Sequence, residues 1–208
     1  MADVRDMNDG DMNYGDMDDG DMDDGIDDRV DDGVAHLGET VAAFDRRVDA
    51  LFDRLRGERY ADRLFLTASS LGDWSLLWHL LGVARGIIRR RPDQVVALAL
   101  ALGFESLIVN QGIKRLFRRP RPTVDGADGL GVRAPSTSAF PSGHASSAAF
   151  AATLLIRWDG RRWAPLWATV AVLVAVSRIH VRIHHASDVV AGALTGHVLA
   201  RTVRRLVR

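Results

Sequence analysis

Apolar residues recur every three or four positions through most of the chain after residue 33, which is the spacing of one face of a helix. From Val34 to Arg63 charged residues occupy the remaining positions, so this segment predicts an amphipathic helix that covers a core or lies in a membrane interface. From residue 64 onward apolar stretches alternate with Gly, Pro and Arg clusters. They predict further helices at Leu64–Ile88, with a break at Gly72-Asp73, and at Asp93–Ile113, Ser142–Arg157, Trp163–Val176 and Ser187–Val203.

These predicted helices are short for membrane spans, and none offers an uninterrupted run of 18 apolar residues. However, the five Trp residues fall near predicted helix ends, where membrane interfaces concentrate aromatic side chains. Arg clusters mark the same ends, as at Arg89–Arg91 and Arg201–Arg208. We therefore predict an all-α bundle of about five membrane-spanning helices, with a soluble helical domain as the alternative.

The first 33 residues have a different composition. A five-residue unit repeats from Asp6 as DMNDG, DMNYG and twice DMDDG, and the segment holds fourteen Asp against two Arg. So little apolar surface cannot offset the entropy lost on folding, so the segment predicts a disordered acidic tail. Its carboxylate spacing fits neither an EF-hand loop nor a Gly-rich nonapeptide repeat, which makes calcium binding the weaker interpretation. The predicted domains are the tail at 1–33, an amphipathic segment at 34–63 and a membrane-embedded domain at 64–208.

The net charge of zero hides an uneven distribution. Because the tail is so acidic, the rest of the chain carries an excess of about twelve positive charges, almost all of them Arg. Arg binds anions through planar, two-point contacts, which favours an anionic ligand. The absence of Cys excludes disulfides, thiolate nucleophiles and Cys-ligated zinc. The first thirty residues also lack the basic start and apolar stretch of a secretory signal peptide.

Three polar clusters interrupt the apolar stretches. The first reads KRLFRRPRP, the second is PSGH at the start of a predicted helix, and the third reads SRIHVRIHHASD. Taken singly, each has an ordinary explanation as a solvated basic loop, a helix N-cap or a hydrogen-bonded structural His. The residues of interest in these clusters are Lys114, Arg121, Ser142, Gly143, His144, Arg178, His184 and Asp188.

Taken together, the clusters match the patterns K-x6-RP, PSGH and SR-x5-H-x3-D without a substitution. In this combination the chain resembles the type 2 phosphatidic acid phosphatase family, whose relatives include bacterial acid phosphatases, glucose-6-phosphatase and vanadium haloperoxidases. The resemblance covers roughly Leu64 to Arg208 and does not include the acidic tail. It implies hydrolysis of a phosphate mono- or diphosphate ester. The membrane setting adds a lipid phosphate partner, with polyprenyl pyrophosphate and phosphatidate as the leading types.

The chemistry of phosphate transfer accounts for the cationic and amide donors of these motifs. The reaction spreads negative charge over three oxygens and therefore needs positive donors held in position. Lys114, Arg121 and Arg178 are the predicted donors of this kind. Ser142 and Gly143, at a helix N-terminus, add backbone amides and a hydroxyl.

The remaining motif residues suit covalent catalysis. His184 is the predicted nucleophile, and Asp188 fixes its tautomer and stabilises the charge that develops on the ring. His144 is the predicted general acid, which protonates the leaving alkoxide. A phosphohistidine intermediate follows, and water hydrolyses it. We expect no metal or other cofactor, because three side-chain cations supply the electrostatic stabilisation, and no nucleic-acid partner.

Several neighbouring residues do not fit the motif spacing. His180 and His185 flank the predicted nucleophile at other distances from the motif, so we treat both as secondary. Arg119 precedes a Pro as Arg121 does, but it stands two residues too early. Together with Arg118 and Arg182, it is a candidate for holding a second phosphate or a lipid headgroup.

Three other functions are compatible with these motifs but fit the chain less well. A vanadate-dependent haloperoxidase would share the pocket, but such relatives are much longer and soluble. A soluble non-specific acid phosphatase would normally carry a signal peptide. A membrane protein that only binds anions would be favoured by loss of one catalytic His, and neither is missing.

The distribution of Arg also predicts a topology. Arg85–Arg91, Arg157–Arg162 and Arg201–Arg208 fall on the side opposite the three motifs, and the positive-inside rule places them in the cytoplasm. The prediction is a multi-pass protein of the cell membrane with its active site on the outer face. The six Arg of Arg46–Arg63 conflict with it, unless that helix rests on the outer surface or a further crossing precedes Trp74.

Overall fold

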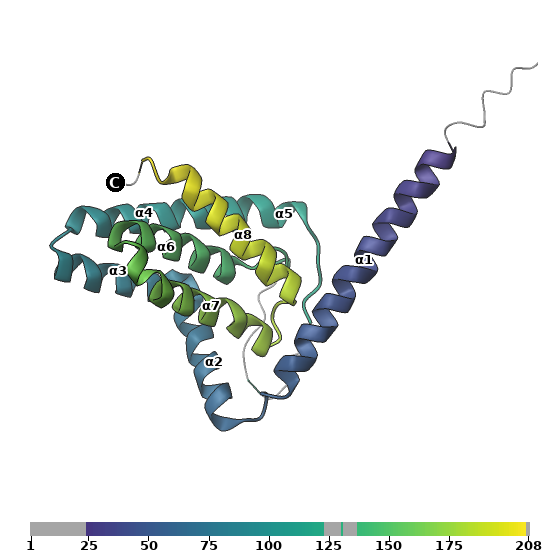
Figure 1. The fold of residues 1–208 in the computed structure, drawn as a ribbon, viewed down its shortest axis with the longest axis horizontal. Helices are drawn as coiled ribbons and strands as arrows, with labels where there is room; N and C mark the ends of the chain where they lie inside the picture. The colour runs from purple at the N-terminus through teal and green to yellow at the C-terminus, as the bar shows by residue number, and fades with distance from the viewer. Residues whose placement is uncertain (1–23, 123–129, 131–136, 207–208) are drawn as a thin grey trace, which may run out of the picture. The chain divides into compact units, whose positions relative to one another are not determined.

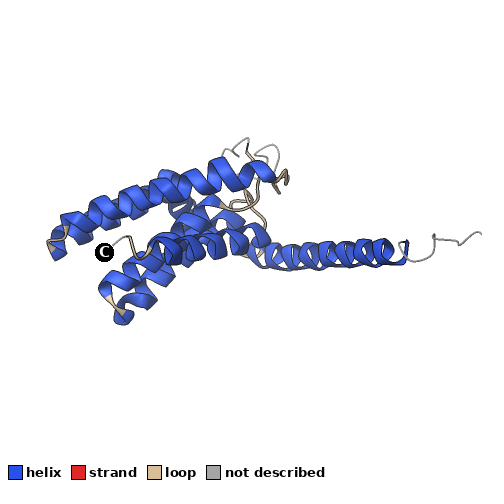
Figure 2. Ribbon diagram, turned by 90° about the horizontal axis from the view of Figure 1, so that it is seen from above, coloured by secondary structure: helices blue, strands red, loops and turns tan. Residues whose placement is uncertain are grey.

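The structure of the protein is a computed structural model that describes residues 24–122, 130 and 137–206. Every regular element in these ranges is a helix, as Figures 1 and 2 show, so the predicted all-α class is confirmed. In addition to α-helices there are two 3-10 turns, η1 and η3, and one π-helical segment, η2. The elements are α1 (Asp24–Asp53), α2 (Arg59–Gly72), η1 (Asp73–Ser75), α3 (Leu76–Arg89), α4 (Pro92–Ser106), η2 (Leu107–Ile113), α5 (Lys114–Leu116), α6 (Gly143–Asp159), η3 (Arg161–Trp163), α7 (Ala164–His180) and α8 (Ala186–Val203).

The predicted amphipathic segment forms two helices rather than one. α1 begins ten residues before the predicted boundary at Val34, because the four-residue apolar spacing continues upstream through Ile26 and Val30. It ends at Asp53. Gly57, with a φ of 88°, then turns the chain into α2, and this left-handed conformation is one that Gly adopts without a steric cost.

The chain divides into two compact units, residues 1–40 and 41–208. All the contacts discussed below lie within the second unit. The first 23 residues, which hold three of the acidic repeats and the start of the fourth, lie outside the described residues, and the fourth repeat ends within α1. The predicted disorder of those residues and the predicted domain limits therefore stay predictions.

The remaining helices follow the predicted pattern, with one main difference at the first motif. The break expected at Gly72-Asp73 is present as η1, between α2 and α3. The helix expected to end at Ile113 continues through η2 and α5 to Leu116, so Lys114 stands on the last turn of a helix and not in the loop that follows.

Two helical stretches of the described chain are long and apolar enough to cross a membrane, namely Pro92–Leu116 and Arg161–His180. The first of them is continuous only because η2 and α5 extend α4. The expected number of about five crossings therefore stays a prediction, whereas the helical elements expected to make them are present.

Helix α6 lies at the centre of the bundle and packs against α4, α7 and α8 (Figure 1). Its sequence has little amphipathic character because it is buried on most sides. Phe150, Leu154 and Leu155 have no exposed surface, and the core continues through Trp78 of α3 and Leu98 of α4. The PSGH motif is thus attached to the most buried helix among the described residues.

The approach of α8 to α6 depends on two Gly residues. A Cβ atom on Gly192 would lie 2.3 Å from the carbonyl oxygen of Ser142, and one on Gly196 would lie 2.0 Å from that of Ser146. Such small-xxx-small spacing lets two helix backbones touch, as in many membrane proteins. Here it brings the middle of α8 against the beginning of α6.

A buried ion pair connects the helices at the other end of the bundle. Arg85 of α3 donates to Asp159 of α6 at 2.8 Å and to Gln94 of α4 at 2.7 Å. The indole of Trp167 donates to the same carboxylate at 3.0 Å. Arg85 is therefore a buried structural residue and does not count among the exposed Arg of the positive-inside argument.

Gly196→Ala should destabilise the protein, because the new methyl group would overlap a backbone carbonyl that cannot move without α6. Overpacking of this kind costs about 1–3 kcal/mol. We expect Tm in detergent to fall by several degrees, roughly 3–8 °C.

Gly103→Ala is the matched control, since Gly103 lies on exposed helix α4 surface with no atom within 4 Å of the added Cβ. That change should leave Tm unaltered or raise it slightly. Equal Tm values for the two variants would contradict the close approach of α8 to α6.

Candidate active site

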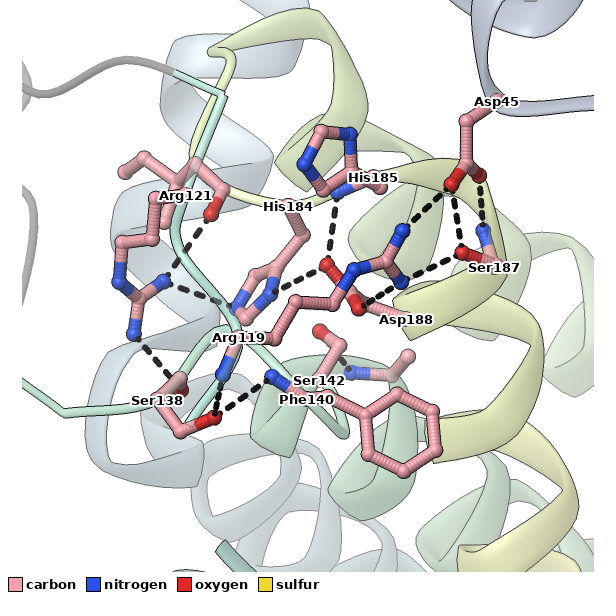
Figure 3. Close-up of polar contacts among 12 residues, drawn as sticks. Asp45, Arg119, Arg121, Ser138, Phe140, Ser142, His184, His185, Ser187 and Asp188 are labelled. Carbon is pink, nitrogen blue, oxygen red and sulfur yellow. Dashed lines mark hydrogen bonds and ion pairs between the residues drawn. The ribbon is translucent and has the colours of Figure 1, made fainter. Parts of the chain in front are cut away.

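The three motifs meet at one end of the bundle, although they lie on separate segments of the chain (Figure 3). The Ser142 amide donates to the backbone carbonyl of Asp188 at 3.0 Å, which joins the second motif to the third. Arg121 donates to the carbonyl of Ile183 at 3.0 Å, which joins the first motif to the third. A Cβ on Gly143 would lie 3.6 Å from Nζ of Lys114.

His184 lies on the short connection between α7 and α8 and is 3 % exposed. Its Nε2 is 3.3 Å from a guanidinium nitrogen of Arg121, and its Nδ1 is 3.7 Å from a carboxylate oxygen of Asp188. This arrangement suits the tautomer with a proton on Nδ1 and a lone pair on Nε2. The Nδ1 distance exceeds that of a hydrogen bond, so in this state Asp188 acts on the ring through its charge.

Burial lowers the pKa of His184 to about 3, because the charged ring would lose its hydration. The positive charges of Arg121, Arg178 and Lys114 act in the same direction, and Asp188 opposes them. The ring is therefore neutral at pH 7, which is the form that a nucleophilic His requires.

The predicted cationic donors surround this imidazole. Arg121 is held by the backbone carbonyls of Thr137 and Ser138 as well as that of Ile183. Arg178 is 3 % exposed and donates to the hydroxyl of Ser69 on α2. Fixed guanidinium groups of this kind can bind phosphate oxygens without reorganising.

The structure modifies the expected role of Ser142. This residue caps α6, with its hydroxyl 3.5 Å from the Ala145 amide, and its own amide is already bonded to the Asp188 carbonyl. The Ser142 amide is thus not free to bind phosphate, contrary to expectation. The amides of Gly143 and His144 occupy the first helical turn, where no intrahelical acceptor exists, so they are the available donors.

His144 has a partner that the motifs did not predict. Its Nε2 is 2.9 Å from a carboxylate oxygen of Asp73, at the break between α2 and α3. Gly72 leaves the space for this ring, since a Cβ there would lie 2.6 Å from Cδ2 of His144. The break in the helical pattern at Gly72-Asp73 was visible in the sequence, but nothing there connected it with His144.

Asp188 is completely buried and both of its carboxylate oxygens are engaged. One accepts from the His185 amide at 2.9 Å, and the other accepts from Arg119 at 2.6 Å. Arg119 in turn contacts Asp45 of α1 at 2.6 Å. Asp45, Ser69, Asp73 and Arg119 are the residues near the site that motif spacing missed.

The secondary candidates have mainly structural contacts. His180 has no exposed surface and pairs with Asp62 at 2.8 Å. His185 is the N-cap of α8. Arg119 and Arg182 both have carboxylate partners, so among the described residues only Arg118 of the three candidate headgroup ligands has no carboxylate or hydrogen-bond partner. No group of three or more potential metal ligands occurs in the described ranges.

The fold is similar to that of two solved structures. One is a transmembrane PAP2 type phosphatidylglycerolphosphate phosphatase from Bacillus subtilis, with a TM-score of 0.63 and 22% sequence identity over 80% of this chain and 86% of that chain. The other is LpxE from Aquifex aeolicus, with a TM-score of 0.63 and 27% identity over 76% of this chain and 93% of that one.

Curated relatives point to the same family. The chain is 36% identical over 137 residues to decaprenylphosphoryl-5-phosphoribose phosphatase from Mycobacterium tuberculosis, covering 65% of this chain and 74% of that protein. It is 33% identical over 127 residues to the protein of the same name from Mycolicibacterium smegmatis, covering 60% and 67%. The PAP2 superfamily profile matches residues 94–208, which include all three motifs. The chain therefore belongs to the PAP2 superfamily, and its predicted class, a hydrolase of phosphate esters, is confirmed.

Proposed function

We propose that this phosphatase acts on a lipid phosphate at a membrane surface and transfers the phosphoryl group to Nε2 of His184. The observation that carries the proposal is the neutral, buried imidazole of His184, whose Nε2 faces Arg121. The positive charges of Lys114 and Arg178 also act on this ring. A nucleophile surrounded by fixed cations suits a phosphate dianion better than any neutral substrate.

The first step follows from these positions. Phosphate oxygens bind to Arg121, Arg178 and Lys114, and Nε2 of His184 attacks phosphorus in line with the leaving oxygen. The P–N bond forms as the P–O bond to the leaving group breaks. His144 gives its proton to the departing alkoxide. The imidazolium that forms is stabilised by Asp188, whose carboxylate lies on the Nδ1 side.

The second step reuses the same groups in reverse. His144, now neutral, accepts a proton from a water molecule as that water attacks the phosphohistidine. The P–N bond breaks, phosphate leaves, and His184 regains its lone pair. Asp73, at 2.9 Å from His144, stabilises the protonated form of that ring and keeps it oriented in both steps.

The lipid nature of the substrate is supported by the relatives and by the helices. The curated relatives are named for a decaprenyl-linked phosphoribose, and one solved structure is named for a phosphatidylglycerol phosphate. Two helical stretches within the described residues are long and apolar enough to cross a membrane. Of the two substrate types expected from the sequence, we favour a polyprenyl-linked phosphate ester. The same observations favour a lipid phosphatase over a haloperoxidase or a soluble acid phosphatase.

We also propose that the site faces the outside of the cell. The motif residues share one end of the bundle, and the ion pair of Arg85 with Asp159 joins the α3–α4 and α6–α7 turns at the other end. The exposed Arg residues of that other end are Arg89–Arg91, Arg157, Arg161, Arg162, Arg201, Arg204 and Arg205. The positive-inside rule places them in the cytoplasm.

Replacing His144 with Ala should slow hydrolysis more for substrates with a more basic leaving group. For an alkyl phosphate we expect kcat/KM to fall by about 10²–10⁴-fold, since the alkoxide needs a proton. For nitrophenyl phosphate the loss should be much smaller, because nitrophenolate leaves without one. Equal losses on both substrates would exclude His144 as the general acid.

Wild-type rates of hydrolysis should be the same with and without EDTA, because the proposed site uses side-chain cations only. A strict magnesium requirement would contradict this.

Single Cys residues can test the orientation, because the chain has none of its own. We would introduce Ala127→Cys, at a position between the first and second motifs, and Arg161→Cys, at a position in the exposed turn before α7. An impermeant thiol reagent should label intact cells at residue 127 only. Labelling at residue 161 alone would reverse the topology and place the substrate in the cytoplasm.

A further inference from the structure

A carboxylate far upstream of the matched family segment reaches the catalytic residues. Asp45 lies on α1, 7 % exposed, whereas the PAP2 match begins at residue 94. One of its oxygens accepts from the Ser187 amide at 2.8 Å. The other accepts from the Ser187 hydroxyl at 2.8 Å and from Arg119 at 2.6 Å (Figure 3). A surface Asp would not be expected to satisfy three donors at once.

Arg119 connects this carboxylate to the predicted catalytic one. One guanidinium nitrogen donates to Asp45, and another donates to Asp188 at 2.6 Å and to the Ser187 hydroxyl at 2.7 Å. The Arg119 amide is itself bonded to the Ser138 hydroxyl at 3.2 Å, which fixes the loop that carries it. The planar guanidinium therefore holds two carboxylates at set positions, one on each of its two terminal nitrogens.

We propose that Asp45 and Arg119 are positioning residues for the Asp188–His184 pair, so that α1 is a working part of the active site. The inference rests on the proposed function, in which His184 becomes an imidazolium. Asp188 has one oxygen on the His185 amide and the other on Arg119, which leaves a single orientation toward the ring.

The charges give Asp45 a second effect. Arg119 and Asp188 alone would form a neutral pair with little attraction for a developing imidazolium. With Asp45 included, two carboxylates share one guanidinium, and the group carries a net negative charge beside His184. In a buried site such a charge is weakly screened. Asp45 thus lets Arg119 orient Asp188 without cancelling its charge.

A purely structural tether is the competing explanation, because α1 and the turn after it have other contacts with the same region. Arg56 donates to the carbonyls of Ile179 and His180, and it pairs with Asp49 at 2.6 Å. Asp49 lies one helical turn after Asp45 and has no contact with the Asp188 network. It provides a matched control on the same helix.

The experiment is a double-mutant cycle on the full-length protein in detergent, assayed with a long-chain alkyl phosphate. Asp45→Asn should lower kcat about tenfold and change KM by less than about twofold, since the phosphate donors are untouched. Arg119→Gln should lower kcat at least as much, and Asp49→Asn should not change it. In an Asp188→Asn background, Asp45→Asn should change kcat by less than about twofold, because its target is gone.

Three results would overturn the proposal. The first is an unchanged kcat in Asp45→Asn. The second is a loss of kcat in Asp45→Asn by the same factor with and without the Asp188 carboxylate. The third is an equal loss of kcat in Asp49→Asn and Asp45→Asn. Tm values for each variant separate loss of folding from loss of turnover. If Asp188→Asn itself kept the wild-type kcat, the proposed roles of Asp188 and His184 would fail first, and the positioning role with them.

Discussion

The site depends on the contact between the beginnings of α6 and α8. No side chain separates Gly192 from the backbone of Ser142, and the Ser142 amide is bonded to the carbonyl of Asp188. These contacts bring the first turn of α6, with its favourable dipole and the Gly143 and His144 amides that lack intrahelical acceptors, next to the carboxylate of Asp188, the proposed partner of the nucleophile. The position of α8 relative to α6 is therefore constrained, because a shift of α8 would move Asp188 and His184 together relative to the PSGH turn.

Charge is arranged around this contact in two layers. The cations lie next to the imidazole, where they add to the effect of burial in keeping the ring neutral, and they suit a phosphate dianion. Behind it stand the carboxylates of Asp188 and Asp45, with the guanidinium of Arg119 between them. In the proposed mechanism the first layer favours binding of the anion, and the second favours the positive charge that forms on His184 during transfer. Both layers are buried enough that water screens them weakly.

The amino-acid sequence was sufficient for the helical class, for most helix limits and for the residues of the three motifs, because periodicity and short spacing record local structure. It was not sufficient for contacts between distant segments. Nothing in the amphipathic pattern around Asp45 separates a buried, bonded carboxylate from an exposed one. Asp73 marked a helix break but not the partner of His144. The free amide expected at Ser142 was wrong for the same reason, since its acceptor lies 46 positions away in the chain.

The central claim is that His184 carries the phosphoryl group between two steps. The most direct measurement is rapid-quench trapping with a phosphate ester labelled with ³²P, quenched into alkali, where a phosphohistidine survives, and compared with acid, where it is lost. The wild-type protein should show alkali-stable, acid-labile label on the peptide that contains His184, and His184→Ala should show none while still binding vanadate. Label of equal amount in His184→Ala, or label stable in acid, would contradict the account.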